Sequence, residues 1–173
     1  MYAVITGASS GIGEQLAKRL AKEGYDLILV ARRRERLTAL SDKLTATHKG
    51  LWCDIFTADL MQLDECQRLS DYLEEKDVEI FINNAGYGDC GLFEETDIAK
   101  EMGMIDVNVR AVHFLTKKLL RQMRVKDRGF ILNVASSAGL IPAGPYMAAY
   151  YASKAYVASL SRAVACELRQ SHS

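Results

Sequence analysis

The sequence predicts an α/β protein built on a parallel sheet that is wound with helices on both faces. Three observations indicate this fold class. Short apolar segments alternate with helical segments along the whole chain, which is typical of parallel strands joined by helical crossovers. Asp26–Ala31 (DLILVA) is apolar at consecutive positions, as expected of a strand buried on both faces. A glycine-rich turn follows the first strand, as at the start of a doubly wound sheet.

Five apolar segments have the length and composition of buried strands. They are Tyr2–Ile5, Asp26–Ala31, Leu51–Ile55, Val78–Ile82 and Phe130–Val134. Each is followed by a turn or a helical segment, so no two of them can form a simple hairpin. All neighbours in the sheet are therefore expected to be parallel.

Helical periodicity and stop signals place the helices between these strands. They are expected at about Ile12–Glu23, Arg34–Thr47, Leu60–Glu75, Asp97–Arg124 and Tyr146–Arg169. Gly24 ends the first helix. The long fourth helix carries apolar residues on one side, namely Met102, Ile105, Val109, Val112 and Leu115.

Length and composition indicate one globular domain, residues 1–173, because 49% of the residues are apolar and 25% are charged. Lys+Arg and Asp+Glu both number 22, so no overall charge draws the chain to nucleic acid. No apolar run reaches the roughly 20 residues that span a bilayer. A strand and turn begin at the N-terminus without a signal peptide, so a cytoplasmic protein is expected.

The four cysteines show no CxxC pairing and lie in or beside apolar segments. We expect buried free thiols in a reducing compartment, with disulfides or a metal site as the alternatives. The three histidines are too scattered to suggest metal ligands. The sequence therefore predicts no metal.

The turn after the first strand has the spacing Gly-x-x-x-Gly-x-Gly. Its residues are Thr6, Gly7, Ala8, Ser9, Ser10, Gly11, Ile12 and Gly13. Glycines allow a sharp turn and close approach of a ligand, and the following helix start offers unpaired N–H groups to an anion. We expect a dinucleotide pyrophosphate here. A Gly/Ser-rich surface turn is the alternative.

The end of the second strand distinguishes the two nicotinamide cofactors. NAD sites place a carboxylate there, whereas this chain continues with Arg32, Arg33 and Arg34 before its first carboxylate, Glu35. A guanidinium suits a 2′-phosphate, so NADP(H) is expected. The alternative is a solvated basic helix start, which the helix dipole disfavours.

Tyr150 and Lys154 lie one helical turn apart, thirteen residues after Ser137. An adjacent ammonium favours the ionised form of a phenol, which suits it to acid–base chemistry. Tyr72 and Lys76 have the same spacing but lack that context. We interpret the second pair as a solvated helix face.

With these motifs placed, the chain resembles the short-chain dehydrogenase/reductases of the NADP-preferring type. The matches occur in the family's order and cover nearly the whole chain. They are TGASSGIG at Thr6–Gly13, Asp59-Leu60, Asn83-Asn84-Ala85-Gly86, Asn108 in VNV, Ser137 in NVASSAG, and Tyr150-x-x-x-Lys154. The resemblance implies a Rossmann fold that starts with strand order 3-2-1-4-5.

The resemblance also implies roles for these residues. Tyr150 would exchange a proton with a carbonyl or alcohol substrate during hydride transfer, and Lys154 would assist it and bind the nicotinamide ribose. Ser137 would hold the substrate oxygen and Asn108 would support a water leading to Lys154. Ser136 and Tyr151 are adjacent alternatives, and Asn108 alternatively makes only a polar contact inside the helix.

The family's cofactor contacts carry over by position. Asp59 and Leu60 would contact the adenine, and Asn84, Ala85 and Gly86 would line the adenosine ribose. The glycine turn, Arg32 and Arg33 complete the expected NADP(H) site, together with Tyr150 and Lys154. The substrate pocket would be shaped by Gly88–Phe93 and Leu140–Met147.

The family pattern continues beyond the helix that carries Tyr150, into a sixth strand and a substrate-covering segment. This sequence ends at Ser173, so the later strands and the lid are expected to be missing and strand 5 to form an apolar edge. Two functions follow: a carbonyl reductase or alcohol dehydrogenase, or a cofactor-binding module with weak or no catalysis. Family dimers often pack the helices before and after strand 5, so a homodimer or higher homo-oligomer is expected.

Overall fold

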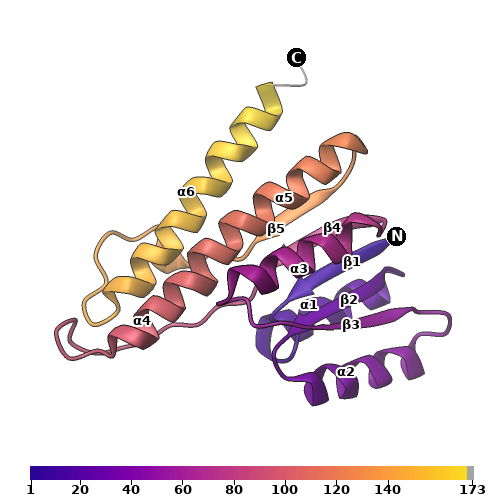
Figure 1. The fold of residues 1–173 in the computed structure, drawn as a ribbon, viewed down its shortest axis with the longest axis horizontal. Coiled ribbons are helices and arrows are strands. Elements are labelled where there is room, and N and C mark those ends of the chain that lie inside the picture. Colours follow the sequence, from indigo (N-terminus) through magenta and orange to yellow (C-terminus); the bar gives the residue numbers. More distant parts are fainter. Residues whose placement is uncertain (171–173) are drawn as a thin grey trace.

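The computed structural model describes residues 1–170, which form a parallel sheet covered by helices on both faces (Figure 1). Its strands are β1 (Tyr2–Thr6), β2 (Asp26–Ala31), β3 (Cys53–Thr57), β4 (Val78–Asn83) and β5 (Phe130–Asn133). Their order is β3-β2-β1-β4-β5, and every neighbouring pair is parallel. This confirms the predicted fold class and strand order. The predicted domain runs to Ser173, and its last three residues lie outside those described.

Six α-helices are described within residues 1–170. They are α1 (Gly11–Lys22), α2 (Arg34–Thr47), α3 (Leu63–Glu74), α4 (Ile98–Ile105), α5 (Val112–Val125) and α6 (Ala148–Gln170). Helices α1 and α2 cover one face of the sheet, and α3, α5 and α6 lie on the other. In Figure 1, α4 and α5 run one after the other beside α6.

The two faces of the sheet are buried in alternation along the central strands. In β2, Leu27 and Leu29 pack toward α1 and α2, whereas Ile28 and Val30 pack toward α3 and α5. All four are 0% exposed. The uninterrupted apolar run of β2 therefore follows from burial on both sides.

Strand β3 begins two residues later than the sequence predicted. The apolar start at Leu51 and Trp52 suggested an earlier strand, but Trp52 is 62% exposed and its indole N–H donates to Asp54 Oδ1 at 2.9 Å. The strand instead extends to Thr57 and buries Phe56. An exposed aromatic residue can precede an edge strand, so the apolar pattern alone does not show where β3 begins.

The long helix expected over Asp97–Arg124 is interrupted. A π-helical turn, η1 (Asp106–Ala111), separates α4 from α5 and contains the fully buried Asn108. Such turns insert one residue and occur often at functional sites. The apolar spacing on either side remains helical, so the insertion could not be predicted from the apolar pattern.

The last helix begins at Ala148, two residues after the predicted start at Tyr146. Tyr146 has a φ of 65° and Ala143 a φ of 63°, which is left-handed backbone outside a helix. The loop before α6 is therefore sharply turned. Its peptide carbonyl at Tyr146 accepts from Gly91 N at 2.8 Å, which joins it to the loop after β4.

Two of the four cysteines contradict the prediction of buried thiols. Cys66 is buried and Cys53 half-buried, but Cys90 and Cys166 are exposed. Cys90 lies in the loop between β4 and α4, and Cys166 lies on an outward side of α6. Among residues 1–170, no helix is both long and apolar enough to cross a bilayer.

Candidate functional site

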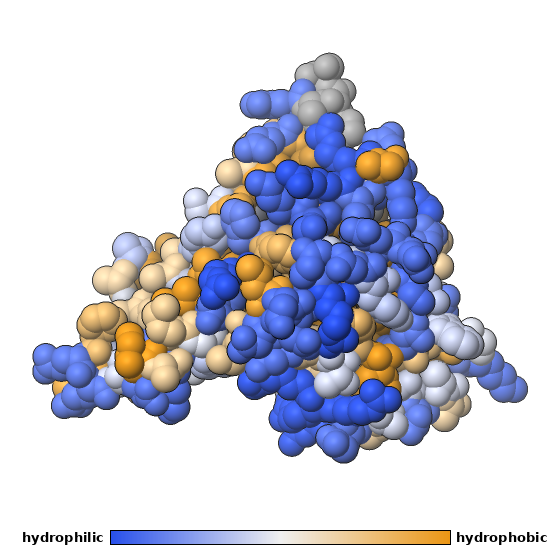
Figure 2. All heavy atoms as spheres, in the orientation of Figure 1, coloured by the Kyte–Doolittle hydropathy of each residue, from blue (hydrophilic) through white to orange (hydrophobic). Residues whose placement is uncertain are grey.

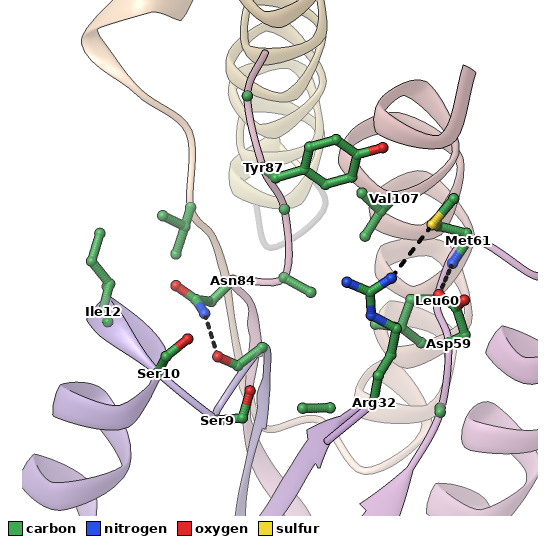
Figure 3. Close-up of a pocket in the computed structure, with 18 of the residues that line it drawn as sticks. Ser9, Ser10, Ile12, Arg32, Asp59, Leu60, Met61, Asn84, Tyr87 and Val107 are labelled. Carbon is green, nitrogen blue, oxygen red and sulfur yellow. Dashed lines mark hydrogen bonds between the residues drawn. The ribbon is translucent and has the colours of Figure 1, made fainter. Parts of the chain in front are cut away.

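A cleft of about 470 Å³ opens at the carboxyl ends of the strands, where β1 and β4 diverge (Figure 3). Ligands of doubly wound sheets bind at such a switch point. Fourteen of the predicted site residues line it: Gly7, Ser9, Ser10, Gly11, Ile12, Arg32, Arg33, Asp59, Leu60, Asn84, Ala85, Gly86, Tyr150 and Lys154. The other four, Thr6, Gly13, Asn108 and Ser137, do not.

Thr6 ties the two diverging strands together below the cleft. It is 1% exposed, and its hydroxyl accepts hydrogen bonds from Asn84 N at 2.9 Å and Ala85 N at 3.0 Å. The same hydroxyl donates to Ile82 O at 3.2 Å. Its hydrogen-bonding capacity is thereby used within the protein, so Thr6 fixes the position of the Asn84–Gly86 turn.

The glycine turn packs directly against that segment. Gly7 has a φ of 67°, and a Cβ there would lie 2.8 Å from Ala85 Cα. Asn84 Nδ2 also donates to Thr6 O at 2.9 Å and to Gly7 O at 3.4 Å. No other residue would fit the turn at Gly7, because both the backbone conformation and the close approach exclude a side chain.

The start of α1 points its peptide N–H groups at the cleft. Ser10 is the N-cap residue, yet its side chain makes no capping hydrogen bond. Instead Ser9 Oγ and Ser10 Oγ each accept from Arg33 Nη2 at 2.9 Å. An uncapped helix start beside a guanidinium is suited to bind an anion.

Arg32 extends into the other end of the cleft, toward Asp59, Met61 and Tyr87 (Figure 3). Its Nη1 lies 3.8 Å from Met61 Sδ, the one contact drawn for this guanidinium. The Asp59 carboxylate accepts from Met61 N at 3.2 Å. Arg32 and Arg33, which are predicted to favour NADP(H) over NAD(H), thus lie on opposite sides of the cleft.

Sequence reasoning missed several lining residues. Met61, Tyr87 and Val107 line the cleft. Met61 directly follows Asp59-Leu60 and Tyr87 directly follows Gly86, so extending each motif by one residue would have found both. Burial raises the pKa of Tyr87, and its hydroxyl donates to Lys100 O at 2.7 Å. Val107 directly precedes Asn108 in the VNV motif, so the same extension would have found it.

Tyr150 and Lys154 occupy the end of the cleft next to β5. Lys154 is 7% exposed, and its Nζ donates to Val134 O at 2.9 Å and lies 6.0 Å from the centre of the Tyr150 ring. Burial lowers the pKa of Lys154 below its ordinary value. The Tyr150 ring packs on Gly88, where a Cβ would lie 3.0 Å from Cδ2.

Tyr151, the alternative to Tyr150, has different surroundings. Its ring packs against Gly144, where a Cβ would overlap it. It meets the Tyr150 ring edge-on, with 6.5 Å between the centres. Tyr150 lines the cleft and Tyr151 does not.

Asn108 lies behind the cleft and joins two segments of it. Its Oδ1 accepts from Tyr87 N at 3.1 Å, and its Nδ2 donates to Tyr87 O at 2.9 Å and to Ser153 Oγ at 3.1 Å. Ser153 in turn donates to Tyr150 O at 2.7 Å. Both amide protons of Asn108 are used. Ser153, a buried polar residue next to Lys154, was not predicted.

The two candidate serines differ in what their side chains do. Ser136 caps the short 3₁₀ turn η2 (Ser137–Gly139), its Oγ accepting from Ala138 N at 3.2 Å. Ser137 is exposed. Gly139 packs so closely on the backbone of Lys154 that a side chain would clash, which holds the turn against the start of α6.

The second Tyr-x-x-x-Lys pair lies at the far end of the sheet, near the start of β1. Tyr72 OH donates to Asp54 Oδ2 at 2.8 Å, and Lys76 pairs with the same carboxylate at 3.5 Å. Burial and the Asp54 hydrogen bond raise the pKa of Tyr72. This pair is a structural cluster that includes Asp54, and the prediction of a merely solvated helix face was too simple.

Comparison with known proteins found matches over nearly the whole chain. The family model described as short chain dehydrogenase matches residues 1–172. The chain is 33% identical to a very-long-chain 3-oxoacyl-CoA reductase of Emericella nidulans over 97% of its own length and 49% of the relative's. It thus spans about half the length of the curated relatives it matches.

Solved structures agree with this assignment. The bulky-bulky ketone specific alcohol dehydrogenase from Comamonas testosteroni is 34% identical with a TM-score of 0.92, covering 98% of this chain and 68% of that one. A short-chain dehydrogenase from Sphingobium yanoikuyae in complex with NADPH is also 34% identical with a TM-score of 0.92. In that case 99% of this chain and 66% of the other are covered.

Replacement of Lys154 by methionine should change how stability depends on pH. Because burial lowers the pKa of Lys154, the unfolded chain binds more protons than the folded protein at pH values between the lowered and the ordinary pKa. The free energy of unfolding should therefore rise with pH toward about 10.4 in the wild type, relative to Lys154→Met. Urea titrations at stepped pH measure this difference. Lys43→Met, at an exposed position of α2, is the control, and parallel curves for wild type and Lys154→Met would contradict the prediction.

Proposed function

The chain belongs to the short-chain dehydrogenase family, and we propose that it is an NADP(H)-dependent oxidoreductase that transfers hydride between nicotinamide and a carbonyl or alcohol substrate. One observation carries the proposal: a single cleft contains the uncapped start of α1, the Arg32–Arg33 pair and the Tyr150–Lys154 pair. When bound, the cofactor supplies the hydride chemistry. The protein supplies orientation and one proton donor.

The cofactor site follows from the charges around the glycine turn. The N–H groups at the start of α1 would hold the pyrophosphate. Arg33, already hydrogen-bonded to Ser9 and Ser10, would exchange those contacts for the 2′-phosphate or share them with it. Arg32 and Asp59-Leu60 would border the adenine, and Asn84, Ala85 and Gly86 the ribose. The NADPH complex of the Sphingobium yanoikuyae enzyme supports NADP(H) as the cofactor.

The proton chemistry belongs to Tyr150. Its hydroxyl would give a proton to the substrate oxygen in reduction and remove one in oxidation. The buried ammonium of Lys154, 6.0 Å from the centre of the Tyr150 ring, would bind the nicotinamide ribose. Ser137, on the turn that packs against α6, would hold the substrate oxygen, and Asn108 would act indirectly by fixing Ser153 and the first turn of α6.

An apolar entrance supports a substrate with a large apolar group. Leu92, Phe93, Leu140, Ile141 and Tyr146 are between 46% and 70% exposed. They come from two loops that meet through the Gly91 N to Tyr146 O hydrogen bond and flank Tyr150. Figure 2 shows apolar residues gathered at this projecting end of the molecule. The names of the relatives, a very-long-chain acyl reductase and a bulky-ketone dehydrogenase, point the same way.

Charge along the α4–α5 helix supports a two-fold symmetric dimer. The segment just before α4 carries exposed acids at Glu94, Glu95 and Asp97, whereas Lys117, Lys118 and Arg121 lie on α5. The basic residues border a groove of about 520 Å³ that also contains Leu63, Phe114 and Tyr156. Antiparallel packing of two copies would set the basic end of one helix against the acidic end of the other. A cytoplasmic location stays a prediction.

Tyr150→Phe should abolish most of the activity because it removes the proton donor while preserving the ring. NADPH oxidation with apolar aldehydes, ketones and diketones should fall by about 10²- to 10⁴-fold. Tyr72→Phe, in the pair of identical spacing, should change the rate by less than about twofold. Equal rates for wild type and Tyr150→Phe would favour the alternative of a binding module without catalysis.

Replacing both Arg32 and Arg33 by alanine should separate the two cofactors. Loss of charge-assisted hydrogen bonds should weaken NADPH binding by about 10- to 100-fold and NADH binding by less than about threefold. Titration calorimetry with each cofactor measures this. Arg36→Ala, an exposed arginine one turn further along α2, is the control. Equal losses for both cofactors would mean that the arginines do not contact a 2′-phosphate.

Charge reversal on α5 should dissociate the dimer. Lys117→Glu combined with Lys118→Glu places like charges opposite each other, so sedimentation equilibrium should detect a monomer at protein concentrations where the wild type is dimeric. Lys43→Glu, on the opposite face of the sheet, should leave the dimer intact. A wild type that sediments as a monomer would refute the proposed assembly.

A further inference from the structure

Four polar side chains form a connected set behind the catalytic end of the sheet. Asn83 Nδ2 donates to Asn133 Oδ1 at 2.8 Å and to Thr116 Oγ1 at 3.1 Å, and Thr116 Oγ1 donates to Asn133 Oδ1 at 3.1 Å. Asn133 Nδ2 then donates to Ser161 Oγ at 3.0 Å. Asn83 is 3% and Thr116 5% exposed. The set therefore links β4, α5, β5 and α6, and none of its members lines the cofactor cleft.

Helix α6 is buried mainly along its first half. Of its 23 residues, the buried ones are Ser153, Lys154, Val157 and Ala158. Beyond Ala158, Asn133 Nδ2 donates to Ser161 Oγ and joins α6 to β5.

Two hydrogen bonds thus join α6 to the end of β5. Lys154 Nζ donates to Val134 O, and Ser161 Oγ accepts from the side chain of Asn133. Lys154 and Ser161 are seven residues apart, which is close to two helical turns and places them on one side of the helix. Asn133 and Val134 are consecutive, so both hydrogen bonds hold α6 at the same point, the end of β5.

We propose that Asn133 and Ser161 are positioning residues that fix the axial register of α6 on β5 and thereby hold Lys154 at the cleft. This inference rests on the proposed function of Lys154. A slip of one residue moves a helix by about 1.5 Å along its axis, which would break a hydrogen bond of 2.9 Å. Apolar side chains at these positions would permit such sliding, whereas a directional hydrogen bond does not.

The orientation of Asn133 is itself fixed from the other side. Its Oδ1 accepts from Asn83 and Thr116, so its Nδ2 must point toward α6. Asn83 pairs with Asn133 across the sheet, and Val134 N donates to Asn83 O at 2.9 Å. The position of α6 is therefore set by β4 and α5 as well as by β5.

Ser161→Ala is the variant of choice, because it removes one hydroxyl from a half-buried position and leaves Asn83, Thr116 and Asn133 paired with one another. We expect kcat for alcohol oxidation with NADP⁺ to fall by about tenfold while KM changes by less than about threefold. Ser161→Thr, which keeps the hydroxyl, should restore kcat.

Ser159→Ala, an exposed serine of the same helix, is the matched control and should leave kcat unchanged. A purely structural role would reduce the amount of folded protein but leave kcat per folded molecule unchanged. An unchanged kcat per folded molecule in Ser161→Ala would therefore overturn the proposal.

Hydrogen exchange of the amides in residues 148–158 tests the same inference without catalysis. Exchange in Ser161→Ala should be about tenfold faster than in Ser159→Ala. If the wild type shows no turnover, the proposed function fails while faster exchange still supports the positioning role. Equal exchange in the two variants would overturn it.

Discussion

The hydroxyl of Thr6 joins the two strands between which the cleft opens. As β1 and β4 separate, this side chain accepts the N–H groups of Asn84 and Ala85, which a glycine or alanine could not do. Those two residues in turn form the wall against which Gly7 packs. The buried hydroxyl oxygen of Thr6 therefore fixes the two sides of the cleft relative to each other. A buried N–H group without a partner would cost free energy of folding, so these hydrogen bonds strongly favour the observed position of Asn84 and Ala85 beside Thr6.

Five of the nine buried polar side chains among residues 1–170 lie near the carboxyl ends of the strands. The cores on the two faces of the sheet are apolar, whereas Thr6, Asn83, Asn108, Ser153 and Lys154 are all buried near the cleft. Apolar packing fixes how far apart the layers lie but permits small slips. Hydrogen bonds are directional and fix positions more narrowly. The distribution therefore suits a site in which the distances between side chains matter.

The two Tyr-x-x-x-Lys pairs show that spacing alone does not define such a site. Tyr72 donates a hydrogen bond to Asp54, which also pairs with Lys76, and burial together with this hydrogen bond favours the neutral tyrosine. Lys154 instead donates to a neutral backbone carbonyl, Val134 O, and lies 6.0 Å from the centre of the Tyr150 ring. Its ammonium therefore has no carboxylate partner in the contacts described for it. The same residue types at the same spacing are suited to opposite tasks because their third partners differ.

The parallel sheet, the glycine turn and the two arginines at the end of β2 could be predicted because each depends on local pattern and on spacing along the chain. The strand order and the contacts of Asp59, Leu60 and Asn84–Gly86 followed from the family resemblance, and fourteen of the predicted site residues line one cleft. The start of β3, the π turn around Asn108 and the exposure of Cys90 and Cys166 depended on packing between distant segments. The hydrogen bonds from Asn108 to Ser153 and from Asn133 to Ser161 join residues 45 and 28 positions apart. The folded structure was needed to find these pairs, because hydrogen-bond partners so far apart leave no periodicity in the chain.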